Sequence, residues 1–264
     1  MTETLPPAVP LADAVARALH GKTTADSIGS LQAVAAKVLA AQREAMTAVG
    51  EIELDYLRDL SEIARTRTLV AVTLLKASCD HGLAIATLLA ASIENFAAPA
   101  LALHRTQIET YARGVFFRSA ATEEELMHFL RKDEMPKRLR SNGKRTSIVA
   151  KEVLRAAVLA EDVDPTKLES MMDNVWRDLS GIVHGGRPTL ATYRTANVIG
   201  ARLDARGARA LLGNTGVLTI MACSGISGIR DDSTEAMQSI LARIAAASDA
   251  VARAVGLPAT ASRS

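Results

Sequence analysis

The stretch that decides the fold runs from Arg67 to Ala91 and reads RTLVAVTLLKASCDHGLAIATLLAA. It is mainly Ala, Leu, Val and Ile, with the charged or titratable residues Lys76, Asp80 and His81 interposed. Ala and Leu favour helices, and the run is far longer than an ordinary strand. The stretch therefore predicts a long apolar helix.

The helical pattern continues toward the C-terminus. A second long helix is expected from about residue 94 to residue 119, with Pro99 in or near its first turn. Thr122 followed by Glu125 is a capping box and predicts a short helix. No stretch alternates between apolar and polar residues over five or more positions, so no sheet is expected. The other segments are predicted as a loop over residues 133–144 and as helices over residues 145–160, 164–184, 193–203, 208–228 and 236–256.

The segment on the N-terminal side is expected to pack as a helical arm. Its main helix is capped by Asp26 or Ser27 and interrupted by Gly50, and the acidic stretch 51–64 is expected to be helical again. We therefore predict an all-α fold, an antiparallel helical bundle in one domain. Its divisions are the arm over residues 1–64, the bundle over residues 65–258 and a disordered tail over residues 259–264.

The composition indicates in which cellular compartment the protein lies and which kinds of partner it can bind. The chain has 31 basic and 29 acidic residues, a net charge of +2, so any basic surface must be local. Cys79 and Cys223 lack metal-ligand spacing and are expected to be reduced thiols of a cytoplasmic protein. No signal peptide is visible. Residues 211–229 are uncharged, which fits a buried helix or a membrane span. Their glycines and polar residues favour the buried helix, so no membrane association is expected.

A second stretch, WRDLSGIVHGG from Trp176 to Gly186, carries the main candidate for chemistry. Arg177 and His184 are seven residues apart, close to two helical turns, so they share one face of a helix that the two glycines end. With Asp178 beside the cation, this pair could grip and cleave a phosphodiester, or it could hold the helix to its neighbour. The helix C-terminus would favour the charged imidazole.

Arg105, Glu109 and Arg113 form a charged stripe on the second long helix, four residues apart. Because the flanking residues are apolar, we expect the stripe to point inward, toward the 165–184 helix. Two interpretations remain open: a salt-bridge ladder that fixes helix register, or contacts to a substrate phosphate beside the Arg–His pair. His81 is a further candidate for this site, with a hydrogen-bonded core histidine as the alternative.

Residues 131–155 hold nine basic and three acidic residues. A loop with this excess of positive charge attracts a phosphate backbone by releasing counterions, and a solvated loop without a ligand is the simpler alternative. The stretch has no aromatic residue, so base stacking is not expected. No His-x3-His or Cys-x2-Cys spacing occurs, so neither a metal nor another cofactor is expected. The candidate contacts to an RNA backbone are Lys137, Arg138, Arg140, Lys144 and Arg145.

The stretch Arg177–His184 resembles the motif of the HEPN superfamily (higher eukaryotes and prokaryotes nucleotide-binding), in which an Arg, a polar residue and a few further residues precede a His. Residues 67–190, especially Leu103–Arg113 and Leu179–Gly186, are also similar to helical bacterial proteins, some of them related to abortive-infection components. These resemblances extend over about half of the chain.

The resemblance implies a HEPN-like bundle and metal-independent RNA cleavage at a site shared by two protomers. The His would act as general acid or base, and the Arg would steady the phosphate. It also implies a toxin or phage-defence role and a homodimer. Many members of the superfamily lack activity, so the alternative is a non-catalytic helical protein that binds a nucleotide, RNA or a protein partner.

Overall fold

The structure is a computed structural model, and part of the chain is described in it. The described residues form seven α-helices, one 3-10 helix and two short strands. They are residues 25–52, 55–139, 143–160, 203–229 and 234–257, together with Leu179 and Val183.

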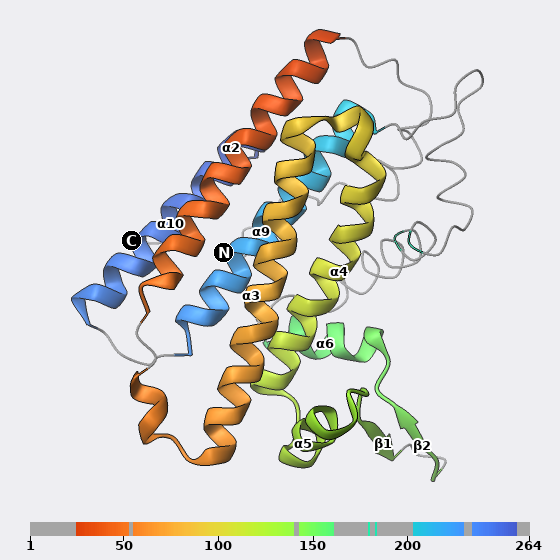
Figure 1. The fold of residues 1–264 in the computed structure, drawn as a ribbon, viewed down its shortest axis with the longest axis vertical. Coiled ribbons are helices and arrows are strands. Elements are labelled where there is room, and N and C mark those ends of the chain that lie inside the picture. Colours follow the sequence, from red (N-terminus) through yellow and green to blue (C-terminus); the bar gives the residue numbers. More distant parts are fainter. Residues whose placement is uncertain are drawn as a thin grey trace, which may run out of the picture.

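Two long helices, α3 (Glu62–Ala91) and α4 (Ile93–Ser119), form an antiparallel pair (Figure 1). A single residue, Ser92, joins them. Its amide donates to Leu88 O at 3.0 Å at the end of α3, and its hydroxyl accepts from Asn95 N at 3.3 Å at the start of α4. The predicted pair of long core helices is confirmed, and one capping serine at the reversal serves both.

α2 (Ala25–Gly50), α9 (Ala205–Ser227) and α10 (Glu235–Val255) complete the bundle (Figure 1). α9 is central, since it packs against α2, α3, α4 and α10. A glycine permits one of these approaches, because a Cβ at Gly216 would lie 2.6 Å from Val251 Cγ1 of α10. α10 ends at the predicted stop, Gly256, whose φ of 80° is a conformation that suits glycine.

α2, which the sequence analysis assigned to an N-terminal arm, packs as a core helix. Leu31, Ala35 and Val38 are at most 1% exposed and belong to the same hydrophobic cluster as residues of the other long helices. The acidic stretch 51–64 is not one helix: Asp55–Asp59 form a 3-10 helix, η1, and α3 begins at Glu62. Helical periodicity predicted that α2 is a helix, but its packing against α3, α9 and α10 places it in the core.

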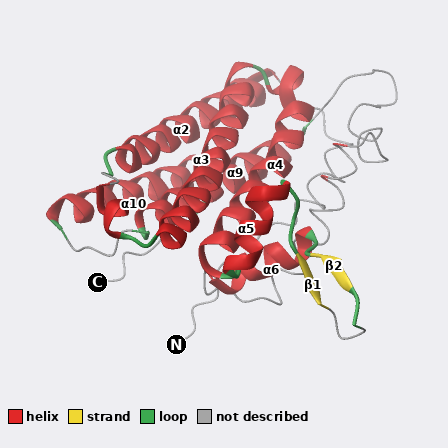
Figure 2. Cartoon of the chain, turned by 60° about the horizontal axis from the view of Figure 1, so that its bottom comes forward, coloured by secondary structure: helices red, strands yellow, loops and turns green. Residues whose placement is uncertain are grey.

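A two-stranded antiparallel hairpin corrects both the expectation of no sheet and the loop predicted over residues 133–144 (Figure 2). β1 (Lys137–Leu139) pairs with β2 (Arg145–Ser147). Strands of three residues are too short to produce a recognisable period-two pattern. The hairpin joins α5 (Glu123–Lys132) to α6 (Ala150–Ala160), so the helix predicted over residues 145–160 begins later than expected.

α3 and α9 are long and apolar enough to cross a membrane by length and composition, each with a mean hydropathy of 1.4 over its most apolar window. In this fold 39% of the α3 window and 67% of the α9 window is buried. The core helix of a globular protein meets the same criteria, so length and composition alone do not identify a membrane segment.

Candidate functional site

The Arg–His motif lies mostly outside the described residues: Arg177, Asp178 and His184 are not among them, and neither is Arg140. Leu179 and Val183, within the motif, are described and have helical backbone. Leu179 is 1% exposed and belongs to the hydrophobic core, whereas Val183 is 44% exposed. The motif therefore includes one residue anchored in the core and, one turn later, one that faces outward.

The stripe on α4 divides into an ion pair and a separate cation. Arg105 Nη2 lies 2.9 Å and Arg105 Nε 3.0 Å from Glu109 Oε1, and these two side chains are 17% and 26% exposed. Arg113 is half-buried, and no residue in the described part of the chain forms a hydrogen bond or ion pair with it. A partly buried cation without a counter-charge is costly, so this position favours an anion.

Arg113 and Glu109 line a small cavity between α4 and α6, with a volume of about 40 Å³. That is room for a few water molecules or a small polar group, not for a whole nucleotide. Hydrophobic residues from three segments form the rest of its wall. They are Ala112, Met135, Ala150, Val153 and Leu154.

The cavity lies at the base of the hairpin. Met135 comes two residues before β1, and Ala150 comes three residues after β2. Ile148 N donates to Pro136 O at 2.8 Å and closes this base. The two strands that carry the hairpin cations therefore start and end beside the cavity that Arg113 lines.

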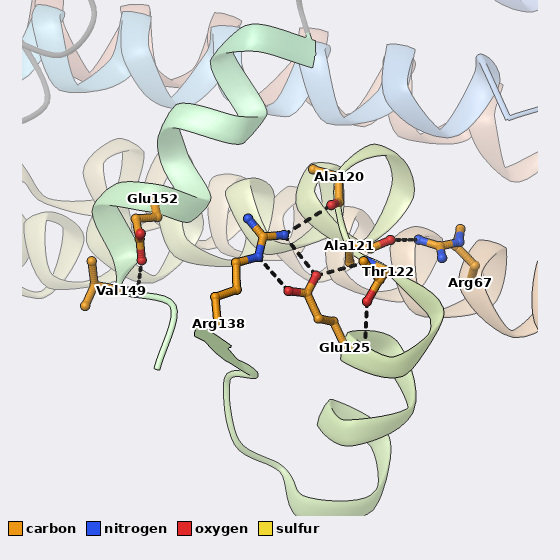
Figure 3. A network of polar contacts seen from close by, with 8 residues as sticks. All are labelled: Arg67, Ala120, Ala121, Thr122, Glu125, Arg138, Val149 and Glu152. Atoms are coloured by element: carbon orange, nitrogen blue, oxygen red, sulfur yellow. Dashed lines mark hydrogen bonds and ion pairs between the residues drawn. The ribbon is translucent and has the colours of Figure 1, made fainter. Parts of the chain in front are cut away.

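Arg138 of β1 fastens the hairpin to the helical body (Figure 3). Its Nε lies 2.6 Å from Glu125 Oε1 and its Nη2 lies 2.9 Å from Glu125 Oε2, a two-pronged ion pair. Nη2 also donates to Ala120 O at 3.3 Å, and the guanidinium lies 5.5 Å from the centre of the Phe116 ring. Of the predicted RNA contacts, Arg138 is therefore occupied within the protein.

Glu125 connects this ion pair to the capping box of α5, which the sequence predicted. Thr122 N donates to Glu125 Oε2 at 2.9 Å, and Glu125 N donates to Thr122 Oγ1 at 3.2 Å. Burial would raise the pKa of Glu125, but the hydrogen bonds from Arg138 and Thr122 outweigh burial and lower that pKa below its ordinary value. The carboxylate remains charged and holds both elements at neutral pH.

The remaining predicted contacts on the hairpin are exposed. Lys137 is on β1, Arg145 is on β2 and Lys144 precedes β2. His81, half-buried on α3, does not line the cavity. Among the described residues, no group of three or more His, Cys, Asp or Glu side chains could hold a metal ion. The described part of the site is therefore cationic and built around Arg113.

A buried polar cluster lies between α2, α3, α4 and α9, and the sequence did not predict it. His104 Nδ1 lies 3.0 Å from Gln107 Oε1, and Gln107 Nε2 donates to Thr215 O at 3.0 Å. Gln42 Nε2 donates to Thr219 Oγ1 at 3.0 Å. Because Gln107 Oε1 can only accept, the neutral imidazole carries its proton on Nδ1. The signal was present as His104 and Gln107, three residues apart on an apolar helix, but their partners are more than 100 residues away in the chain.

Burial lowers the pKa of His104 to about 4, although its hydrogen bond to Gln107 opposes this shift. The imidazole is therefore neutral at physiological pH. All five members of the cluster are at most 1% exposed, so it serves as an internal register element and not as an open site. Gln42 Oε1 accepts no hydrogen bond from the described residues.

Together these features define a class: an all-helical bundle protein with a small cationic hairpin at the base of which lies a half-buried arginine. The chain belongs to DUF6988, a family of unknown function, whose model matches residues 75–252. The matched range contains the stripe, the cavity, the hairpin and the Arg–His motif. No curated protein and no solved structure matches the chain.

Proposed function

We propose that this protein binds RNA through the Arg113 cavity and the hairpin, and that it cleaves the bound RNA without a metal ion. The observation that carries the binding part is the half-buried guanidinium of Arg113, which forms no ion pair or hydrogen bond in the described part of the chain and lines a cavity. Glu109 also lines the cavity but is paired with Arg105, so the three residues of the stripe together carry a net charge of +1.

A phosphate group suits this cavity better than a neutral ligand does. A guanidinium presents donors in a planar fork that matches two phosphate oxygens. The cavity is too small for a base and sugar, so the rest of the ligand must extend outside it. The exposed cations Lys137, Lys144 and Arg145 on the adjoining hairpin suit such an extended polyanion.

The cleavage part rests on the resemblance of Arg177–His184 to the HEPN motif. In this proposal the 2′-hydroxyl attacks the adjacent phosphate, His184 takes or gives the proton, and Arg177 stabilises the charge on the phosphate. Asp178 lies beside Arg177 and completes the motif. One Arg–His pair offers few groups to a scissile phosphate, so two protomers would contribute to one site as a homodimer.

Binding is tested by fluorescence anisotropy with labelled single-stranded RNA. Arg113→Gln should weaken binding about tenfold to a hundredfold, because a charge-assisted hydrogen bond contributes about 1.5–3 kcal/mol. Arg253→Gln is the matched control: it removes the same charge from an exposed position on α10, away from the cavity. Equal affinity for the Arg113→Gln variant and the wild type would reject the cavity as the binding site.

The hairpin contribution is measured by the salt dependence of the same binding. Log affinity falls as log salt rises, and the double variant Lys137→Gln/Arg145→Gln should make this negative slope less steep by about one to two. An unchanged slope would remove the hairpin from the interface.

Cleavage is tested with purified protein, RNA and a chelator. Wild type should cut, whereas His184→Ala and Arg177→Ala, each folded by circular dichroism, should not. Cutting by either variant would exclude that residue from the mechanism. RNA binding without cutting by the wild type would favour a second candidate, a non-catalytic RNA- or nucleotide-binding protein, which the Arg113 cavity supports equally well.

A further inference from the structure

Cys79 of α3 and Cys223 of α9 meet in the core although 144 positions separate them in the chain. Their Sγ atoms are 3.8 Å apart, both thiols are free, and both residues are 0% exposed. Cys79 Sγ also lies 3.7 Å from Thr219 O, one turn before Cys223 on α9. The two sulfur atoms therefore face each other across a helix interface that is already tightly packed.

We propose that these cysteines are a modification site: a two-electron oxidant of the peroxide class converts them into an intramolecular disulfide that ties α3 to α9. In the first step the sulfur of one thiolate attacks a peroxide oxygen, and with a proton taken up this gives a sulfenic acid and water. In the second step the other thiol attacks the sulfenic sulfur, the S–S bond forms and a second water leaves. Two thiols lose two electrons, which reduce one peroxide molecule to two waters.

The fold favours this product over the alternatives. A disulfide needs sulfur atoms about 2 Å apart, so the 3.8 Å separation must shrink by a small side-chain movement. The sulfenic acid is enclosed beside its partner thiol, which favours the disulfide over further oxidation or a bond to another molecule. In the unfolded chain the same bond would require closing a very long loop.

The fold also makes the reaction slow. The hydrogen bond with Cys223 and burial both raise the pKa of Cys79, so its reactive thiolate is rare. Oxidant must enter through local opening of the α3–α9 interface. The pair is therefore expected to stay reduced under mild conditions and to respond to sustained oxidation.

The test treats the folded, full-length protein with hydrogen peroxide, quenches it, unfolds it and alkylates the remaining thiols before mass spectrometry. We expect a species lighter by two hydrogens and without alkyl groups, which reverts on reduction. Its melting temperature should be several degrees above that of the reduced protein, because a long loop is closed. Two alkylated thiols after sustained exposure to peroxide well beyond the dose that oxidises a free cysteine peptide, or sulfinic acid without disulfide, would overturn the proposal.

The matched control exchanges two neighbouring residues, Cys223→Ser with Ser224→Cys. It keeps the composition but moves the thiol from a buried to an exposed position on α9. Once folding is verified by circular dichroism, this variant should form no intramolecular disulfide. The reciprocal exchange, Ser78→Cys with Cys79→Ser, turns the other thiol toward α4, where Ser78 Oγ now donates to Gln107 O, and should behave alike. Disulfide formation in either exchanged protein at the level of the wild type would show that the facing geometry is not the cause.

Discussion

At the scale of single residues, Gly82 shows how closely the buried polar cluster is packed. A Cβ at this position would lie 2.2 Å from Thr219 Oγ1 and 2.7 Å from Gln107 Nε2. Both atoms belong to hydrogen bonds between α4 and α9 and within α9. The glycine is needed for close approach and not for an unusual backbone conformation.

Gly82→Ala should lower the free energy of unfolding by about 2 kcal/mol, since overpacking outweighs the helix propensity that alanine gains. Gly29→Ala is the control, because Gly29 also lies within a helix and a Cβ there would have no atom within 4 Å. It should raise stability by about 0.5–1 kcal/mol. Urea unfolding followed by circular dichroism measures both. A stabilised Gly82→Ala protein would contradict the packing of the cluster.

His104 makes stability depend on pH. In the unfolded chain its pKa is near the ordinary 6.5, whereas in the folded protein it is about 4. Between these values only the unfolded state binds the proton. Stability from this residue is therefore complete above pH 6.5 and falls as the pH drops toward 4.

Urea unfolding at pH 7.5 and pH 5 should differ by about 2 kcal/mol through His104 alone. The variant His104→Asn keeps a donor near Nδ1 but does not titrate, so its stability should change less over the same range. An identical pH dependence in the variant and the wild type would show that His104 is not the source.

At the scale of elements, the C-terminal end of α4 is held by guanidinium groups from two other segments (Figure 3). Arg67 of α3 donates to Phe117 O at 2.9 Å and to Ala121 O at 2.7 Å, and Arg138 of β1 donates to Ala120 O. Cations at this end also suit the negative pole of the helix dipole. The position of the hairpin thus depends on the last turn of α4.

Arg138→Ala should loosen the hairpin while leaving the long helices intact. We expect a loss of about 1–2 kcal/mol, since the partner carboxylate is buried but the Arg138 side chain is 41% exposed and screened by solvent. Hydrogen exchange should speed up at the hairpin amides and not in α3. Lys137→Ala changes an exposed neighbour on the same strand and is the control. It should change neither the free energy of unfolding nor the exchange rate of the hairpin amides. Equal loosening in both variants would exclude the ion pair as the cause.

At the scale of the whole molecule, α2 and α9 complete a core that begins with α3 and α4. The family match begins at residue 75 and leaves α2 outside it, yet α2 supplies core residues and Gln42 of the polar cluster. A bundle without α2 would leave apolar faces of α9 and α10 uncovered.

Two adjacent alanines of α2 test this organisation. Ala35 is 0% exposed, whereas Ala36 is exposed. Ala35→Glu places a charge in the core and should cost about 3–5 kcal/mol or abolish folding, whereas Ala36→Glu should stay within about 0.5 kcal/mol of wild type. Size-exclusion chromatography and urea unfolding distinguish the two. Equal stability of both variants would mean that α2 behaves as a detachable arm.

The sequence by itself determined the features that depend on residues close together in the chain. The capping box of Thr122 and Glu125, the stop at Gly256 and the two long helices follow from propensity and spacing within a few residues. The shared face of Arg105, Glu109 and Arg113 was also predictable. Which of the two arginines forms the ion pair with Glu109 was not predictable, because each is four residues away from this carboxylate.

Only the tertiary structure decided the rest. The meeting of Cys79 with Cys223, the polar cluster around His104 and the packing of α2 on α9 all join segments more than 100 residues apart. The hairpin depends on Arg138 reaching Glu125, thirteen residues earlier on another element. Such contacts arise from packing of helix faces against each other, and no local pattern of residues specifies which faces meet.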